Sequence, residues 1–265
     1  MIVRRPAVAG SFYPASATEL GTLVDRLIDA ALATLSASAT APSRAPKALI
    51  VPHAGYIYSG PIAASGFARL VGHRIERIVL VGPAHRVFVH GMVSPGADRL
   101  QTPLGTLAVD QEALACVPAV TPDSVAHARE HSLEVELPFI QRVAPAARIV
   151  PIAVSNQAAE AVGHVLERLW GGPETVFVVS SDLSHYHPYG DGRDRDARTV
   201  ARILARDATL GGEDACGCTG INGLSWLARK ANLVPELVDL RSSGDTAGSR
   251  DAVVGYAAVA YREAA

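Results

Sequence analysis

The chain has 265 residues, of which 49% are hydrophobic and 19% are charged, so it holds enough apolar material for one large domain with a substantial core. Its formal net charge of −2, without any cluster of Lys and Arg, argues against a nucleic-acid partner. No run approaches the ~20 apolar residues of a membrane span, so no membrane association is expected.

Two further features of the sequence point to the cytoplasm. The basic N-terminal residues are followed by Gly10, Ser11 and Pro14, which interrupt the apolar run that a secretory signal needs. The three cysteines cannot form a disulfide framework. We therefore expect a cytoplasmic protein in which a special cysteine is a ligand or a nucleophile rather than half of a disulfide.

In chain order, aliphatic and β-branched runs with abrupt ends alternate with segments whose apolar residues recur at helical spacing. The aliphatic runs are continuous, which is typical of parallel strands covered by helices on both faces. The predicted strands are residues 48–52, 77–82, 147–154, 175–180, 236–240 and 252–261. The predicted helices are residues 17–35, 60–71, 130–143, 158–170, 195–205 and 222–231.

This alternation predicts the fold class. Strands followed by helices favour a single three-layer α/β domain over residues 1–265, with a mostly parallel central sheet flanked by helices. Residues 36–46 are rich in Ser, Ala and Pro and are predicted to form a surface loop rather than a domain boundary.

Histidines follow three of the predicted strands. His53 comes directly after residues 48–52, His85 follows residues 77–82, and His185 and His187 follow residues 175–180. Ligands bind at the carboxyl ends of the strands in open α/β sheets, so we expect these rings to converge on one crevice. A single histidine at such a position is usually structural, but three at one edge of a sheet favour a functional site.

Imidazole binds iron, copper, zinc and nickel, and two histidines with one anionic ligand leave a position open for substrate or water. The residues alone leave the anion open among five candidates. The cysteines lie in a glycine-rich turn before a predicted helix, where the pKa of a thiol is expected to be lowered. The candidates are Asp182, Glu130, Glu134, Cys216 and Cys218.

The segment from Glu130 to Phe139 contains a second pair of possible ligands. His131 and Glu134 are three residues apart and would share one face of the predicted helix over residues 130–143. They could bind a metal or form a surface ion pair. We favour a role in orienting a metal ligand or a substrate.

Six sequence blocks, in this order, resemble the MEMO family, whose bacterial and archaeal members are called AmmeMemoRadiSam system protein B. The resemblance covers essentially the whole chain. The blocks are RPAVAGSFYP at residues 5–14, PHAGYIYSG at 52–60, GPAH at 82–85, EHSLEVELPF at 130–139, SSDLSH at 180–185 and the Cys216-Gly217 turn.

The resemblance implies a fold similar to class III extradiol ring-cleaving dioxygenases, which hold Fe(II) with two histidines and a glutamate. It implies that His53, His85 and Cys216 bind one metal ion, with cysteine in place of the glutamate. Cys218 has no counterpart in the family pattern. It also implies that Asp182 and His185 lie in the pocket, with His185 as the acid/base group. AMMECR1-like and radical-SAM proteins are the implied partners.

The function expected from these residues is that of a mononuclear metal-dependent oxidoreductase, with Fe(II) as the first choice and Cu or Zn as alternatives. The substrate would be a small aromatic or phenolic molecule or a peptide. Catalytic roles fall to His185 and Asp182, and the pocket is expected to be lined by Tyr56, Tyr58, His131 and Glu134. The alternatives are a non-catalytic metal-handling or peptide-binding protein and a zinc hydrolase.

Overall fold

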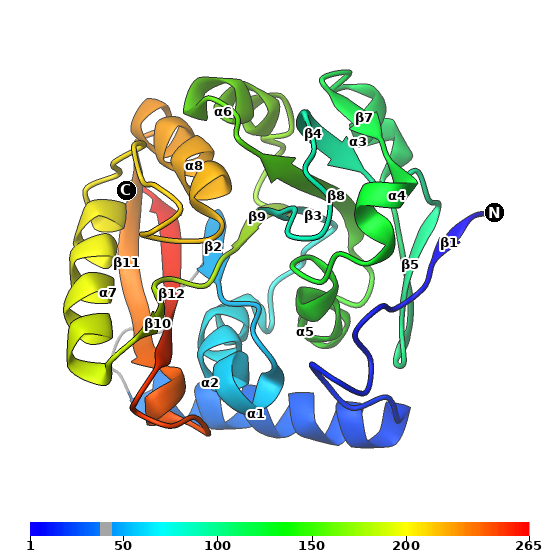
Figure 1. The fold of residues 1–265 in the computed structure, drawn as a ribbon. Helices are drawn as coiled ribbons and strands as arrows, with labels where there is room; N and C mark the ends of the chain where they lie inside the picture. The colour runs from blue at the N-terminus through cyan, green and yellow to red at the C-terminus, as the bar shows by residue number, and fades with distance from the viewer. Residues whose placement is uncertain (38–43, 265) are drawn as a thin grey trace.

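Four parallel strands form the centre of the main sheet, as drawn in Figure 1 for a computed structural model that describes residues 1–37 and 44–264. They lie in the order β2 (Ala48–Val51), β9 (Thr175–Ser180), β3 (Arg77–Pro83) and β8 (Arg148–Ser155). Nearly every residue in them is buried, as their continuous hydrophobicity predicted.

Antiparallel strands extend this sheet at both edges. β12 (Val253–Glu263) pairs with β2, and β11 (Leu233–Ser242) and β10 (His185–His187) both pair with β12. At the other edge, β4 (Gly91–Ser94) pairs with β8 and with β7 (Val120–Pro122). The prediction of a mostly parallel sheet therefore holds for its centre. The short strands β10, β4 and β7 escaped prediction because three or four residues carry little periodic signal.

Helices cover both faces of the sheet, which confirms the predicted three-layer α/β architecture. Side chains alternate along β3, so that Ile78 and Leu80 pack on one face while Val79 and Val81 pack on the other. The first face is covered by α1 (Ala17–Ala37), α2 (Tyr56–Phe67) and α5 (Leu137–Val143). The second is covered by α6 (Ala159–Arg168), α7 (Tyr189–Leu204) and α8 (Cys218–Lys230).

Smaller elements complete the fold. A three-stranded sheet is formed by β1 (Val3–Arg4), β5 (Arg99–Thr102) and β6 (Gly105–Ala108). Two short helices and three 3-10 turns lie in the connections. These are α3 (Gln111–Ala115), α4 (Ser124–Ala128), η1 (Ala68–Leu70), η2 (Glu134–Glu136) and η3 (Ser243–Asp245).

The structure confines the predicted helix over residues 130–143 to η2 and α5, because the Glu130 carboxylate accepts the backbone N–H groups of His131 and Ser132. Pro138 then occupies the first turn of α5, where its missing N–H is tolerated. Most of the predicted loop at residues 36–46 lies outside the described residues. Across residues 1–37 and 44–264, no helix is both long and apolar enough to span a membrane.

Candidate metal centre

The ends of three neighbouring strands bring the predicted ligands together. His53 lies two residues beyond the end of β2, and His85 lies two residues beyond β3, with β9 between these strands. One ligand atom each from His53, His85 and Cys216 lies within 4.8 Å of the others. The convergence expected from the strand-end positions is therefore present in the fold.

His53 is held with one nitrogen facing the other two candidate ligands. Its Nδ1 lies 2.7 Å from the Ser180 hydroxyl, and its backbone N–H donates to Asp182 at 2.9 Å. Its Nε2 lies 3.4 Å from the Cys216 sulfur. Burial, reinforced by the neighbouring His85, holds the pKa of His53 well below its usual value, so the ring is neutral. A neutral ring with its proton on Nδ1 leaves the Nε2 lone pair free for a metal ion.

His85 is oriented by the buried carboxylate of Glu130. Its Nδ1 lies 3.0 Å from Glu130 Oε1, and its backbone N–H donates to Oε2. Burial by itself would raise the pKa of Glu130. The hydrogen bonds from His85 and Ser132 overcome this effect and hold the pKa of Glu130 well below its usual range. A carboxylate behind a histidine ligand is a recurring arrangement in metal sites, where it fixes the ring.

Glu130 could also be read as a ligand, because His85, Glu130 and His131 form a second group of closely spaced donors. The hydrogen bonds oppose this reading. The two oxygens of Glu130 accept the Nδ1 of His85 and four backbone N–H groups, from His85, Arg86, His131 and Ser132. Carboxylate lone pairs occupied in this way are not free for a cation. We therefore assign Glu130 the role of orienting His85.

Cys216 sits in a close turn before α8. The turn needs Gly217, because a Cβ there would lie 2.6 Å from the backbone oxygen of Ser180 and from the Ser181 side chain. Cys218 is instead the first residue of α8 and packs against the hydrophobic cluster between that helix and the sheet. Cys216, and not Cys218, is in the group of converging ligand atoms.

The expectation of a lowered thiol pKa at this turn is wrong for the metal-free protein. Burial, together with the nearby Asp182, raises the pKa of Cys216 to about 12. The helix begins only at Cys218, so the favourable field of its amino end is weakened at Cys216. The thiol must therefore lose its proton when it binds a metal ion.

Asp182 and His185 flank this group of ligands. Asp182 is buried, and burial raises its pKa to about 7, although hydrogen bonds from the backbone of His53 and Ala54 partly oppose the shift. His185 is half-buried at the start of β10, and burial lowers its pKa. Tyr186 beside it has a left-handed φ of 60°, at an irregularity in the pairing with β12. Both predicted catalytic groups thus lie near the crevice.

Of the four residues predicted to line the pocket, two lie elsewhere. The Tyr56 ring is buried against Phe139, and its hydroxyl donates to the Val135 carbonyl at 2.7 Å. Glu134 is buried, pairs with Arg4, and accepts the backbone N–H groups of Ala7 and Val8 at 2.7 and 3.0 Å. These side chains anchor the N-terminal segment to the domain and do not face the crevice.

Aromatic rings border the ligands. The His131 ring stacks on that of His85 at 4.8 Å between centroids and meets His53 edge-on at 5.6 Å. Phe12, which was not among the predicted pocket residues, has its ring centroid 4.7 Å from that of His131. Its position in the N-terminal block Gly10-Ser11-Phe12-Tyr13 was the available signal. Tyr58 is half-buried in α2 and packs on the cluster that contains Tyr256.

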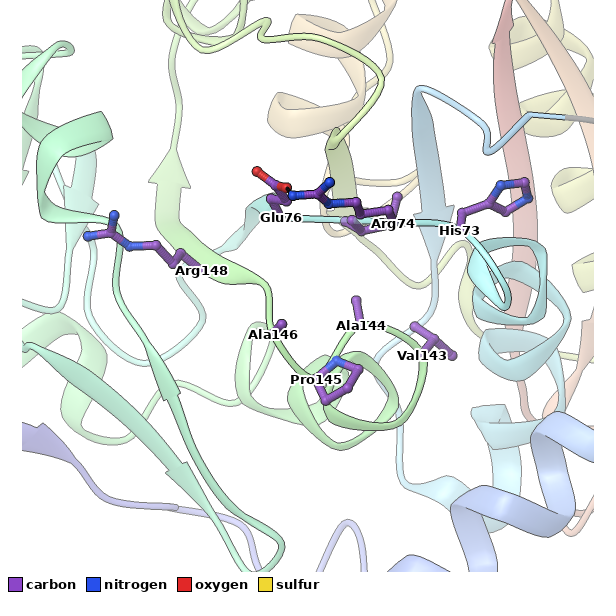
Figure 2. A pocket seen from close by; sticks show the side chains of 9 residues that line it. His73, Arg74, Glu76, Val143, Ala144, Pro145, Ala146 and Arg148 are labelled. Atoms are coloured by element: carbon purple, nitrogen blue, oxygen red, sulfur yellow. Dashed lines mark ion pairs between the residues drawn. The ribbon is translucent and has the colours of Figure 1, made fainter.

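A cavity of about 480 Å³ lies away from this centre, at the amino ends of β3 and β8 (Figure 2). Its charged side chains are paired, with Arg74 to Glu76 at 2.5 Å and Arg148 to Asp110 at 3.8 Å. Its position at the opposite end of the strands separates it from the converging histidines. It is lined by His73, Arg74, Ile75, Glu76, Val143, Ala144, Pro145, Ala146 and Arg148.

Comparison with known proteins agrees with the resemblance of the sequence blocks. The model of a family described as Memo-like protein matches residues 4–260. A MEMO1 family protein of Caldivirga maquilingensis is 35% identical over 287 residues, covering 98% of this chain and 99% of the relative. MEMO1 family proteins of Aquifex aeolicus and Archaeoglobus fulgidus are 35% and 34% identical, covering 97% and 98% of this chain and 98% and 100% of the relatives. The chain therefore belongs to the MEMO family.

Proposed function

We propose that this protein binds one metal ion through His53, His85 and Cys216 and acts as a mononuclear oxidoreductase of the dioxygenase-like kind. The observation that carries the proposal is the convergence of three ligand atoms within 4.8 Å. The proposed substrate is an aromatic or phenolic molecule or a peptide. Fe(II) is the first choice of metal, and Cu and Zn are the alternatives.

The donor set fits a transition metal. A thiolate and two neutral imidazoles select softer ions over Mg²⁺ or Ca²⁺, which prefer oxygen ligands. Both rings have the support that metal-binding histidines require, since Ser180 holds the Nδ1 of His53 and Glu130 holds the Nδ1 of His85. Three protein ligands leave a coordination position open for substrate.

The remaining residues divide the other tasks of such a site. A bound iron or copper ion would supply the capacity to activate O₂. His185 is half-buried, and burial lowers its pKa, so its neutral ring can accept a proton from a substrate as a general base. Asp182 receives the backbone N–H of His53 and so holds the turn that carries this ligand. The rings of Phe12 and His131 offer an aromatic wall for a planar substrate.

The test is metal content and turnover in protein purified anaerobically. We expect stoichiometric iron or copper in the wild type, its loss in His53→Ala, and metal-dependent O₂ consumption with catechols, indoles or tyrosine-containing peptides. His164→Ala is a matched control, because its side chain is 54% exposed and pairs with Glu160 and Glu167 of its own helix, α6. Equal metal content in wild type and His53→Ala would refute the site.

The same measurements separate the alternative function. Bound metal without turnover of any of these substrates would favour a metal-handling or peptide-binding protein that works with AMMECR1-like and radical-SAM proteins. Zinc as the native metal, together with hydrolytic activity that needs Asp182, would favour a hydrolase.

A further inference from the structure

Three glutamates of one short segment are almost completely buried, and their surroundings differ. Glu130 accepts five N–H groups, and Glu134 pairs with Arg4. Glu136, at the end of η2, is 0% exposed, and no ion pair joins it to another residue in the described ranges. Its Oε1 lies 2.9 Å from the Ser180 hydroxyl, and its Oε2 has no hydrogen-bond partner among the residues that the structure describes. An unpaired buried carboxylate would be very costly.

The contacts of the Ser180 hydroxyl indicate whether Glu136 carries a proton. Its oxygen is 2.7 Å from the Nδ1 of His53, 2.7 Å from the Ser132 carbonyl and 2.9 Å from Glu136 Oε1. A hydroxyl has one proton to donate and two lone pairs to accept with. The carbonyl of Ser132 can only accept, so it takes the Ser180 proton. The two lone pairs are then left for donors, namely the Nδ1–H of His53 and a proton on Glu136.

We propose that Glu136 is a neutral carboxylic acid that donates its proton to Ser180 and thereby acts as a positioning residue for His53. With the hydroxyl fixed toward Ser132, Ser180 can only accept from the Nδ1 of His53, which keeps the Nε2 lone pair directed at Cys216. The role toward the ligand rests on the proposed metal site, whereas the protonation of Glu136 does not.

The electrostatic surroundings agree with this geometry. Burial, with a further contribution from Asp182, raises the pKa of Glu136 well above its usual value, although the hydrogen bond to Ser180 partly opposes the shift. A neutral Glu136 also avoids adding a negative charge near the buried Asp182 side chain. A protonated Glu136 can thus donate to Ser180 without adding a buried negative charge.

The protonation is tested by infrared spectroscopy of the metal-free protein at pH 7. We expect the difference between wild type and Glu136→Gln to contain the carbonyl stretch of a protonated carboxylic acid, shifted by ¹³C-labelling of glutamate. Glu112→Gln is the matched control, because its side chain is 86% exposed and should show only carboxylate bands. Carboxylate bands alone in the Glu136→Gln difference would overturn the proposal.

The positioning role is tested by anaerobic Fe(II) titration against a competing chelator. The amide of Glu136→Gln can still donate to Ser180, so its affinity should stay within about threefold of wild type. Glu136→Met removes the donor and should weaken binding by roughly tenfold or more, the usual effect of losing a residue behind a metal ligand. Wild-type affinity in Glu136→Met would refute the role.

Two further arms keep the outcomes distinct. Ser180→Ala removes the acceptor of the Nδ1–H of His53 and should weaken Fe(II) binding about as much as Glu136→Met. If Glu136→Met does not fold, Ser180→Ala tests the positioning role in its place. Equal affinity in Ser180→Ala and wild type would count against the relay. If the wild type binds no Fe(II), the proposed function and the positioning role both fail, while the infrared band still decides the state of Glu136.

Discussion

The Nε2 of His53 lies 3.4 Å from the sulfur of Cys216, although 163 positions separate the two residues in the chain. A tetrahedral ion bonded to both atoms, with metal–nitrogen and metal–sulfur bonds of about 2.0–2.1 and 2.3 Å, would hold them about 3.5 Å apart. The protein therefore presents the two atoms at nearly the spacing that a metal ion requires, without a large rearrangement of β2 or of the turn before α8.

The two cysteines of that turn should differ in their effect on metal binding. We expect Cys216→Ser to weaken Fe(II) binding by at least about 100-fold, since loss of a ligand should exceed the 10- to 100-fold effect of losing a residue behind one. Cys218→Ser is the matched control and should bind normally, because Cys218 packs against the core. Anaerobic titration of both variants measures this. Loss of binding in Cys218→Ser alone would reverse the assignment.

Metal affinity should rise with pH because the Cys216 thiol has a pKa of about 12 in the metal-free protein. Binding must displace about one proton, so affinity should increase about tenfold per pH unit between pH 7.5 and 9. Co(II) titrations by calorimetry, in two buffers with different heats of ionisation, give the number of protons released. An affinity that does not change over this range would argue against a thiol ligand.

Glu130→Gln should damage the site and the fold together. In the wild type, backbone N–H groups donate to both oxygens of Glu130. In the variant, an NH₂ group replaces one of these oxygens and faces the same donors, so we expect a loss of about 1–3 kcal/mol in the free energy of unfolding. Affinity for Fe(II) should fall by about 10- to 100-fold, because His85 loses its orienting acceptor. Urea unfolding and chelator competition measure the two effects. The exposed Glu112→Gln should change neither by more than about 0.5 kcal/mol.

The convergence of His53 and His85 could be predicted from sequence, because each residue closely follows a strand of the sheet. His53 and His85 follow aliphatic strands that end at Val51 and Pro83, and the carboxyl ends of parallel neighbours meet at one edge. The central strands were predictable for the same reason, since their continuous hydrophobicity reflects burial on both faces.

The roles of Glu130, Glu134 and Glu136 could not be predicted in this way. Each glutamate lies in the same seven-residue segment, yet Glu130 contacts His85, Glu134 pairs with Arg4 and Glu136 contacts Ser180. These environments are set by residues that are distant in the chain. The prediction of a lowered pKa for the Cys216 thiol was wrong for a similar reason, because burial by the whole domain outweighs the local field of the α8 terminus.

Acid should destabilise the metal-free protein through His131. Burial lowers the pKa of His131 to about 4, and the nearby Glu130 only partly opposes this. Because the folded-state pKa lies below the unfolded value of about 6.5, the unfolded chain binds more protons between these values. The contribution of His131 is therefore present above about pH 6.5 and is lost as the pH falls toward 4, by up to roughly 3 kcal/mol.

Urea unfolding at several pH values, with a chelator present, measures this loss. His131→Gln cannot gain a proton, so its free energy of unfolding should fall less steeply than that of the wild type between pH 6.5 and 4. The exposed His164→Gln should keep the wild-type slope. Equal slopes for wild type and His131→Gln would show that His131 is not the group responsible.

The N-terminal segment should contribute strongly to stability through one ion pair. The side chains of Arg4 and Glu134 are 10% and 0% exposed, so Arg4→Met leaves a buried carboxylate without its cation and should cost about 3–5 kcal/mol. Arg5→Met is the adjacent control, and because Arg5 is exposed its effect should be within about 0.5 kcal/mol. Urea unfolding of both variants measures the difference.

A double-mutant cycle isolates the pair itself. If the cost of Arg4→Met comes from stranding the Glu134 charge, Arg4→Met should cost less when Glu134→Gln is already present, with a coupling energy of about 0.5–3 kcal/mol. Additive losses would instead assign the effect of Arg4 to its hydrogen bonds with the carbonyls of His127, at 3.1 and 3.2 Å, and Glu130. Loss of the Arg4–Glu134 pair should also affect the crevice, because the N-terminal segment that it anchors contains Phe12, whose ring contacts that of His131. Fe(II) affinity should therefore fall in Arg4→Met and stay unchanged in Arg5→Met.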